Sequence, residues 1–172
     1  DPPTASPAAG LEPRHLAFHP KLPIVYCDDE KGDSVTAYKL NRATGLLKAF
    51  HTLSTLPADF DGDKNSCADI EITRDGKFIY ASNRGHNSIA GFAVDAKTGK
   101  LKSIGQFATG EVPRSFNLGP NNKWLIAAGQ RSHDLHIYER NPKTGKLTKV
   151  RQQPTGKGPG WVQFIPIRVV KK

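Results

Sequence analysis

The chain has 172 residues, of which 37% are hydrophobic and 24% charged, a composition typical of one globular domain with a core. Its apolar runs are too short to span a bilayer, and two cysteines are too few for a disulfide scaffold or a cysteine-based zinc site. We expect a buried, free thiol at Cys27 and a cytoplasmic protein. The start at Asp1 and the absence of methionine indicate a processed chain, a fragment or an incomplete sequence.

The net charge of +9 is unevenly distributed along the chain. Residues 1–75 hold 8 basic and 12 acidic residues, whereas residues 76–172 hold 17 basic and 4 acidic ones. A basic half can attract an anionic metabolite, an acidic partner or nucleic acid. Its lysines lie mostly in turn-like segments, and no aromatic-rich binding motif accompanies them. The composition therefore does not favour nucleic acid or a membrane as the partner.

Residues 1–12 form a Pro/Ala-rich leader, after which the chain repeats itself. The segment 77–82 matches 123–128 at an offset of 46, and an earlier copy lies 54 residues upstream, with a polar loop inserted at 57–64. The repeats divide the chain into three copies and the first strand of a fourth, at about 13–56, 67–110, 113–156 and 159–166.

Each copy contains four strand-length segments separated by turn residues. In the second copy the expected strands are 69–73, 77–82, 88–94 and 101–107. No stretch has a sustained 3.6-residue periodicity, so helices are not expected. Four antiparallel strands per repeat predict an all-β fold, a β-propeller with about three and a fraction four-stranded blades.

Such a partial propeller forms an open arc whose end blades expose apolar faces. A missing half of the same protein or a second copy of this chain could cover those faces, and a small ring of three or four blades is a further alternative. We therefore do not expect the 172 residues alone to form a stable compact monomer.

The start of the first strand and the end of the second lie at one face of a blade, near the channel mouth. The repeat alignment places three groups of residues there: Arg14, Ala68, Arg114 and Gly160, then His15, Asp69, Ser115 and Trp161, and finally Glu30, Arg84 and Gln130. Charged residues that differ between blades are typical of a site assembled around one pocket. The guanidinium groups suit a phosphate or carboxylate ligand. Alternatively, the arginines pair with Glu30, Asp69 or Glu71 and only hold the blades together.

Several segments resemble the lactonase family of seven-bladed propellers, in particular its bacterial 6-phosphogluconolactonases. They are residues 13–20, 68–76, 82–85, 113–117, 127–133 and 158–162. The resemblance covers nearly all of residues 10–166 in order and implies that the chain is the C-terminal half of such a propeller. Family members often have glycine in place of Glu12 and histidine in place of Glu71.

The resemblance implies hydrolysis of a sugar-acid lactone such as 6-phosphogluconolactone, in the pentose phosphate pathway, with no metal or organic cofactor. A fungal cycloisomerase of the family has an arginine, a glutamate sixteen residues later, and a further arginine. Arg14 and Glu30 have that spacing, and the further arginine is Arg84 or Arg114. The family site also uses a histidine from an earlier blade, which this chain does not contain, so an inactive isolated half is one of the expectations that the resemblance implies.

We expect two groups of site residues. Those expected to act in catalysis are Arg14, Glu30 and Arg84. Those expected to bind the substrate, a phosphorylated sugar lactone or another small anion, are His15, Asp69, Arg114 and Gln130. Glu30 would act as general base on a water or position it. The alternative is a non-catalytic propeller fragment that binds a protein or an anionic ligand.

Overall fold

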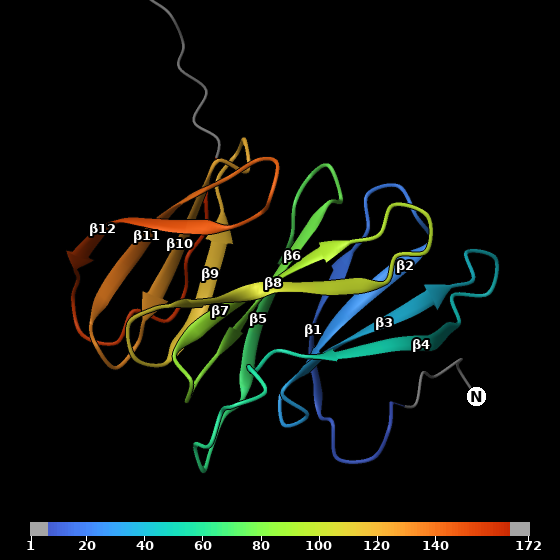
Figure 1. Cartoon of the computed structure of the whole chain (residues 1–172), viewed down its shortest axis with the longest axis horizontal. Helices are drawn as coiled ribbons and strands as arrows, with labels where there is room; N and C mark the ends of the chain where they lie inside the picture. The colour runs from blue at the N-terminus through green and yellow to red at the C-terminus, as the bar shows by residue number, and fades with distance from the viewer. Residues whose placement is uncertain (1–6, 166–172) are drawn as a thin grey trace, which may run out of the picture.

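The computed structural model describes residues 7–165, in which all regular structure is β-strand (Figure 1). The strands are β1 (Pro13–Phe18), β2 (Ile24–Asp29), β3 (Ser34–Leu40), β4 (Leu47–Ser54), β5 (Cys67–Ile72), β6 (Phe78–Asn83), β7 (Ser88–Val94), β8 (Leu101–Ala108), β9 (Pro113–Leu118), β10 (Trp124–Gly129), β11 (Asp134–Arg140) and β12 (Leu147–Pro154). None of the described residues forms a helix long and apolar enough to cross a membrane.

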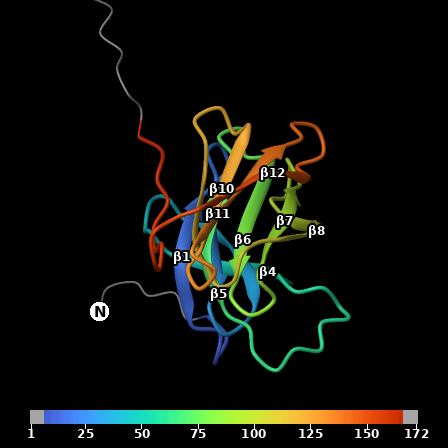
Figure 2. The same cartoon turned by 90° about the vertical axis from the view of Figure 1, so that its left-hand side faces the viewer.

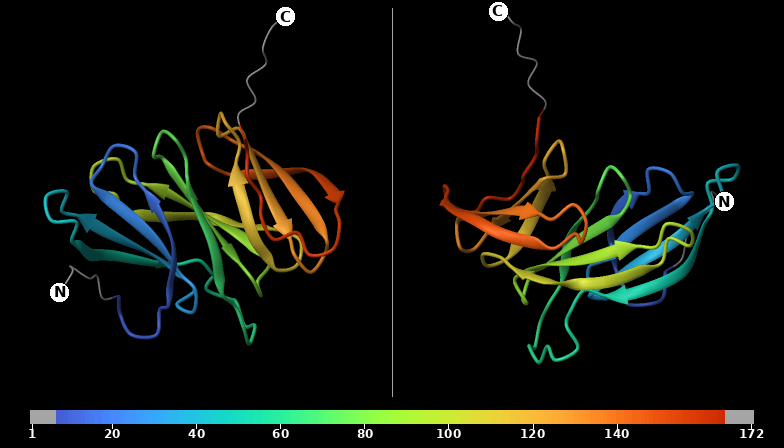
Figure 3. Two further views of the ribbon diagram at one scale, coloured as in Figure 1. Left: turned by 180° about the vertical axis from the view of Figure 1, so that it is seen from behind. Right: turned by 45° about the horizontal axis from the view of Figure 1, so that its top comes forward.

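The strands form three antiparallel four-stranded sheets, each built from strands that are consecutive in the chain. We call them blade 1 (β1–β4), blade 2 (β5–β8) and blade 3 (β9–β12). The first strands of the blades lie side by side, β1 against β5 and β5 against β9, while the last strands lie at the outer edge (Figures 1 and 3). This arrangement confirms the predicted β-propeller architecture.

The hydrophobic core lies in two layers, one between each pair of neighbouring blades. Tyr26 of blade 1 and Ile79 of blade 2 belong to the first layer, and Tyr80 of blade 2 and Leu125 of blade 3 to the second. Every residue of the second strands β2 and β6 is buried, and each of these strands has a strand of its own sheet on either side. The outer strand β12 is polar and mostly exposed, whereas β4 is half exposed and packs Phe50 and Leu53 against the first layer.

Two equivalent hydrogen bonds join neighbouring blades, one at each interface between blades. The Tyr26 hydroxyl donates to the Gly99 carbonyl of blade 2 over 2.8 Å, and the Tyr80 hydroxyl donates to the Gly145 carbonyl of blade 3 over 2.6 Å. Both glycines have a positive φ, and a Cβ on Gly99 would lie 2.1 Å from Ile24 Cδ1. The turn between the third and fourth strands of one blade is thus held tightly against the second strand of the blade before it.

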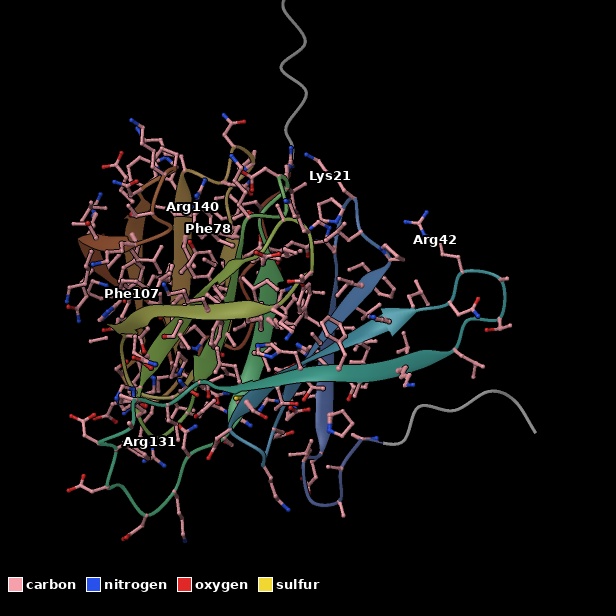
Figure 4. All side chains as sticks on the ribbon, turned by 45° about the vertical axis from the view of Figure 1, so that its right-hand side comes forward. Lys21, Arg42, Phe78, Phe107, Arg131 and Arg140 are labelled. Atoms are coloured by element: carbon pink, nitrogen blue, oxygen red, sulfur yellow. The ribbon has the colours of Figure 1, made fainter. Side chains whose placement is uncertain are left out.

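Arg140 adds a second contact between blades 2 and 3. Its guanidinium lies over the Phe78 ring, 5.5 Å from the ring centroid, and its Nε donates to the Asn122 carbonyl over 2.5 Å (Figure 4). The side chain is buried, so the charge is held by a backbone oxygen and an aromatic face.

The end blades present apolar side chains on their outward faces. Leu16 and Phe18 of β1 are 51% and 60% exposed, and Trp124 of β10 is 37% exposed. The polar insertion at 57–64 contains no strand, as expected, and its loop projects from the blades (Figure 2). Cys27 and Cys67 are both buried and free.

The strand expected at 159–166 is not formed within the described residues, which end at 165. Its N–H groups bond to side chains of β9: Val162 donates to Ser115 Oγ over 3.1 Å and Phe164 to Asn117 Oδ1 over 3.4 Å. The segment therefore lies beside β9, as β9 lies beside β5. Among the described residues no further strand is available to form a backbone ladder with it.

Candidate active site

Two arginines from different blades bind one carboxylate. Arg14 lies near the start of β1, and Glu30 and Arg84 directly follow β2 and β6. Glu30 Oε2 accepts from Arg14 Nη1 over 3.2 Å, and Glu30 Oε1 accepts from Arg84 Nη2. Backbone oxygens of β5 hold both guanidiniums, since Arg14 Nε donates to Ala68 over 2.8 Å and Arg84 Nη2 to Cys67 over 2.9 Å. The expected gathering of these three charged residues is therefore present.

This Arg14–Glu30–Arg84 cluster is largely removed from solvent and carries a net positive charge. Its side chains are 23%, 29% and 14% exposed, in that order. The hydrogen bond and charge of Arg84, with those of Arg14, lower the pKa of Glu30. Arg84 Nε is buried without a hydrogen-bond partner among the described residues. The cluster thus keeps one buried N–H, unpaired in this part of the chain, beside an ionised carboxylate that is a weak proton acceptor.

A histidine and an aspartate from two blades meet beside this cluster. His15 Nδ1 lies 3.0 Å from Asp69 Oδ1, and Asp69 Oδ2 accepts the Phe116 N–H of blade 3 over 3.1 Å. The His15 N–H donates to Asp28 Oδ1 over 2.7 Å. The first strands of all three blades are therefore connected through the Asp69 carboxylate.

Two further carboxyl groups lie in this region. The sequence reasoning named Glu71 only as a possible partner of an arginine and gave Asp28 no role. Burial raises the pKa of Asp28 to about 6. Burial, followed by the charge of Asp69, raises the pKa of Glu71 to about 7, although Asn117 Nδ2 donates to Glu71 Oε1 over 2.6 Å. Two sequence features could have pointed to these carboxyl groups: an aspartate inside the apolar run of β2, and the alternation of Asp69 with Glu71 on β5.

The two site residues expected from blade 3 do not join the cluster. Arg114 is exposed on β9, and its side chain makes no hydrogen bond or ion pair within residues 7–165. Gln130 follows β10, and only its backbone N–H is bonded, to the Val112 carbonyl over 3.0 Å. Of the two candidates for the further arginine, the geometry thus pairs Arg84 with Glu30.

The described part of the chain has no group of three or more His, Cys, Asp or Glu side chains arranged to hold a metal ion.

A family model described as Lactonase, 7-bladed beta-propeller, matches residues 1–164 of the sequence. The chain belongs to this family. Lactonases named 6-phosphogluconolactonase are similar to it: that of Yersinia enterocolitica is 37% identical over 94% of this chain and 48% of its own length, and that of Yersinia pestis is 37% identical over 91% and 47%. The chain spans about half the length of these curated relatives.

Solved structures agree with the lactonase fold. A protein from Lactobacillus plantarum superposes with a TM-score of 0.90 at 32% identity, covering 94% of this chain and 47% of that one. A periplasmic gluconolactonase from Pseudomonas aeruginosa, PpgL, gives a TM-score of 0.80 at 28% identity, covering 87% and 41%. The three blades of this chain therefore have the geometry of three blades of a larger propeller.

Proposed function

We propose that this lactonase chain supplies the arginine site of a 6-phosphogluconolactonase-like enzyme, which hydrolyses the ester of a sugar-acid lactone. The observation that carries the proposal is the Arg14–Glu30–Arg84 cluster, in which two guanidiniums from different blades face one carboxylate. The relatives named 6-phosphogluconolactonase support the substrate class.

The arginines would act on the parts of the substrate that carry or develop negative charge. Guanidinium N–H groups bind a phosphate in a forked geometry, and they stabilise the oxyanion that forms when water adds to the lactone carbonyl. Glu30 holds both guanidiniums in place. Its lowered pKa makes it a poor proton acceptor, so it positions the water rather than deprotonating it. The catalytic and binding roles of the residues selected from the sequence are part of this proposal, and so is a cytoplasmic location.

The experiment is a lactonase assay on the 172-residue chain, with 6-phosphogluconolactone and unphosphorylated gluconolactone as parallel substrates and buffer as the blank. We expect hydrolysis above the blank, preference for the phosphorylated lactone, and a loss of about 10²–10³-fold in kcat/KM for Arg84→Gln. Arg42→Gln is the matched control, because Arg42 is exposed in the turn between β3 and β4 (Figure 4), whereas Glu30 lies in the turn between β2 and β3, at the other end of β3. Hydrolysis no faster than the blank, or equal effects of the two variants, would overturn the proposal.

We further propose that additional propeller blades, from the rest of a seven-bladed protein or from a second copy, cover the two outward faces. The exposed Leu16 and Phe18 on blade 1 and Trp124 on blade 3 support this, as does the half-length match to the relatives. A non-catalytic binding role, the alternative drawn from the sequence, has no specific contact in its favour.

A further inference from the structure

We propose that His15 is the general base of the lactone hydrolysis and that Asp69 is the residue that positions it. This inference rests on the proposed function, since it supplies the proton acceptor that the arginine cluster lacks. Glu30 accepts hydrogen bonds from two guanidiniums, so its carboxylate is already committed to holding Arg14 and Arg84.

The contact with Asp69 determines which nitrogen of His15 carries the proton. A carboxylate can only accept a hydrogen bond, so the His15 Nδ1 that lies 3.0 Å from Asp69 Oδ1 must be the protonated nitrogen. The neutral ring then has an unprotonated Nε2, which is the form that can take a proton from water. Nε2 has no hydrogen-bond partner within residues 7–165, and the side chain is 34% exposed, so water can reach it.

Asp69 is itself held rigidly by backbone groups of two blades. Its Oδ1 accepts the Ile70 N–H over 3.0 Å and its Oδ2 accepts the Phe116 N–H over 3.1 Å. The His15 backbone is fixed in turn, because its N–H donates to Asp28 Oδ1. A base whose orienting carboxylate has so few alternative positions keeps one tautomer and one orientation, as catalysis requires.

The other acids near His15 are poorer candidates for the base. Asp28 is fully buried, and one of its carboxylate oxygens has no partner among the described residues. Glu71 lies two residues further along β5 than Asp69, and Asn117 holds its carboxyl group. His15 alone combines a free acceptor atom, access to water and a position next to Arg14 in the chain.

The step balances without any further reactant. His15 Nε2 removes a proton from water as the water oxygen bonds to the lactone carbonyl carbon, and the carbonyl oxygen becomes an oxyanion next to the guanidiniums. The oxyanion then collapses, the bond to the ring oxygen breaks, and the protonated His15 returns its proton to that oxygen. The product is the open-chain hydroxy acid.

The test compares His15→Gln and Asp69→Asn with His133→Asn, a control at an exposed turn where the positive φ of 59° suits asparagine. We expect His15→Gln to lower kcat by about 10²–10⁴-fold, while the dissociation constant of 6-phosphogluconate, measured by calorimetry, changes less than about threefold. Retained product binding shows that the variant is folded. His133→Asn should leave both quantities unchanged.

A second readout tests the pairing itself. Imidazole ¹⁵N chemical shifts of the parent chain should show neutral His15 protonated at Nδ1, and Asp69→Asn should redistribute that proton and lower kcat. An active parent whose His15→Gln variant keeps its kcat, or a neutral His15 protonated at Nε2, would overturn the inference. Failure of the proposed function is a different result, namely a parent chain that hydrolyses neither lactone faster than buffer.

Discussion

The tyrosine bonds between blades allow the stability of the arc to be tested one hydroxyl at a time. Tyr80→Phe removes only the oxygen that donates to the buried Gly145 carbonyl and leaves the ring packing intact. The lost bond costs about 0.5–1.5 kcal/mol, and the acceptor left buried without a partner costs about 1–3 kcal/mol if no water reaches it. We expect a destabilisation of about 2 kcal/mol, which for a chain of this size lowers Tm by roughly 4–8 °C.

The assay is urea unfolding followed by tryptophan fluorescence, with Tyr26→Phe as the equivalent variant at the other blade interface. Tyr38→Phe is the matched control, since Tyr38 is buried but its hydroxyl has no hydrogen-bond partner in the described part of the chain. We expect Tyr26→Phe to resemble Tyr80→Phe and Tyr38→Phe to stay within about 0.5 kcal/mol of the parent. Equal effects of Tyr80→Phe and Tyr38→Phe would refute the role given to these bonds.

Three further predictions concern the turns, the buried acid and the assembly. Gly99→Ala should destabilise the chain more than Gly45→Ala in urea unfolding. The two glycines have similar φ values of 70° and 74°, but of the two only Gly99 has a neighbour, Ile24, that a Cβ would meet. Equal losses of stability would contradict this. The folded state holds the Glu71 proton up to about pH 7 against a usual pKa of 4.5, so the free energy of unfolding should fall as the pH rises through that interval. Glu71→Gln should flatten this dependence between pH 5 and 8 and the exposed Glu111→Gln should not, whereas an unchanged slope in Glu71→Gln would exclude the buried proton. Light scattering at micromolar concentration should give a mass above that of the chain, and a monomer of 18.8 kDa that unfolds cooperatively would contradict covered end faces.

The sequence was sufficient to predict the blades because each strand is a local pattern repeated at a nearly constant offset. It also predicted that Arg14, Glu30 and Arg84 meet, since the start of a first strand and the end of a second share one edge of every blade. The sequence also offered Glu30, Asp69 and Glu71 as partners of the arginines, and the pairs with Glu30 are the ones that form. The sequence could not choose among the three acids, because that choice depends on side-chain direction and on the backbone oxygens of β5. For the same reason Arg114 remained a candidate until the structure placed it outside the cluster.

The raised pKa values of Asp28 and Glu71 could not be predicted either. They arise from burial between neighbouring blades, and the depth of burial depends on how the blades pack against each other. The strand expected at 159–166 is not formed at 159–165 for a related reason. Its pattern of residues is suitable, but a strand also needs a partner with free backbone groups, and sequence periodicity carries no information about that partner.

The tyrosine bond also gives the arc a polarity. Blade 1 donates a tyrosine hydroxyl to blade 2, and blade 2 donates one to blade 3, so the two ends of the arc are chemically different. At the first end, the turn at Gly45 is the equivalent of the turns at Gly99 and Gly145. At the other end, the repeat places Ile126, which has no hydroxyl, where Tyr26 and Tyr80 stand. Two copies joined end to end would therefore lack this bond at their junction, whereas a blade carrying a tyrosine at that position would restore it at Gly45. A tyrosine-bearing blade is thereby favoured at this edge over a second copy by the contribution of one hydrogen bond, about 0.5–1.5 kcal/mol.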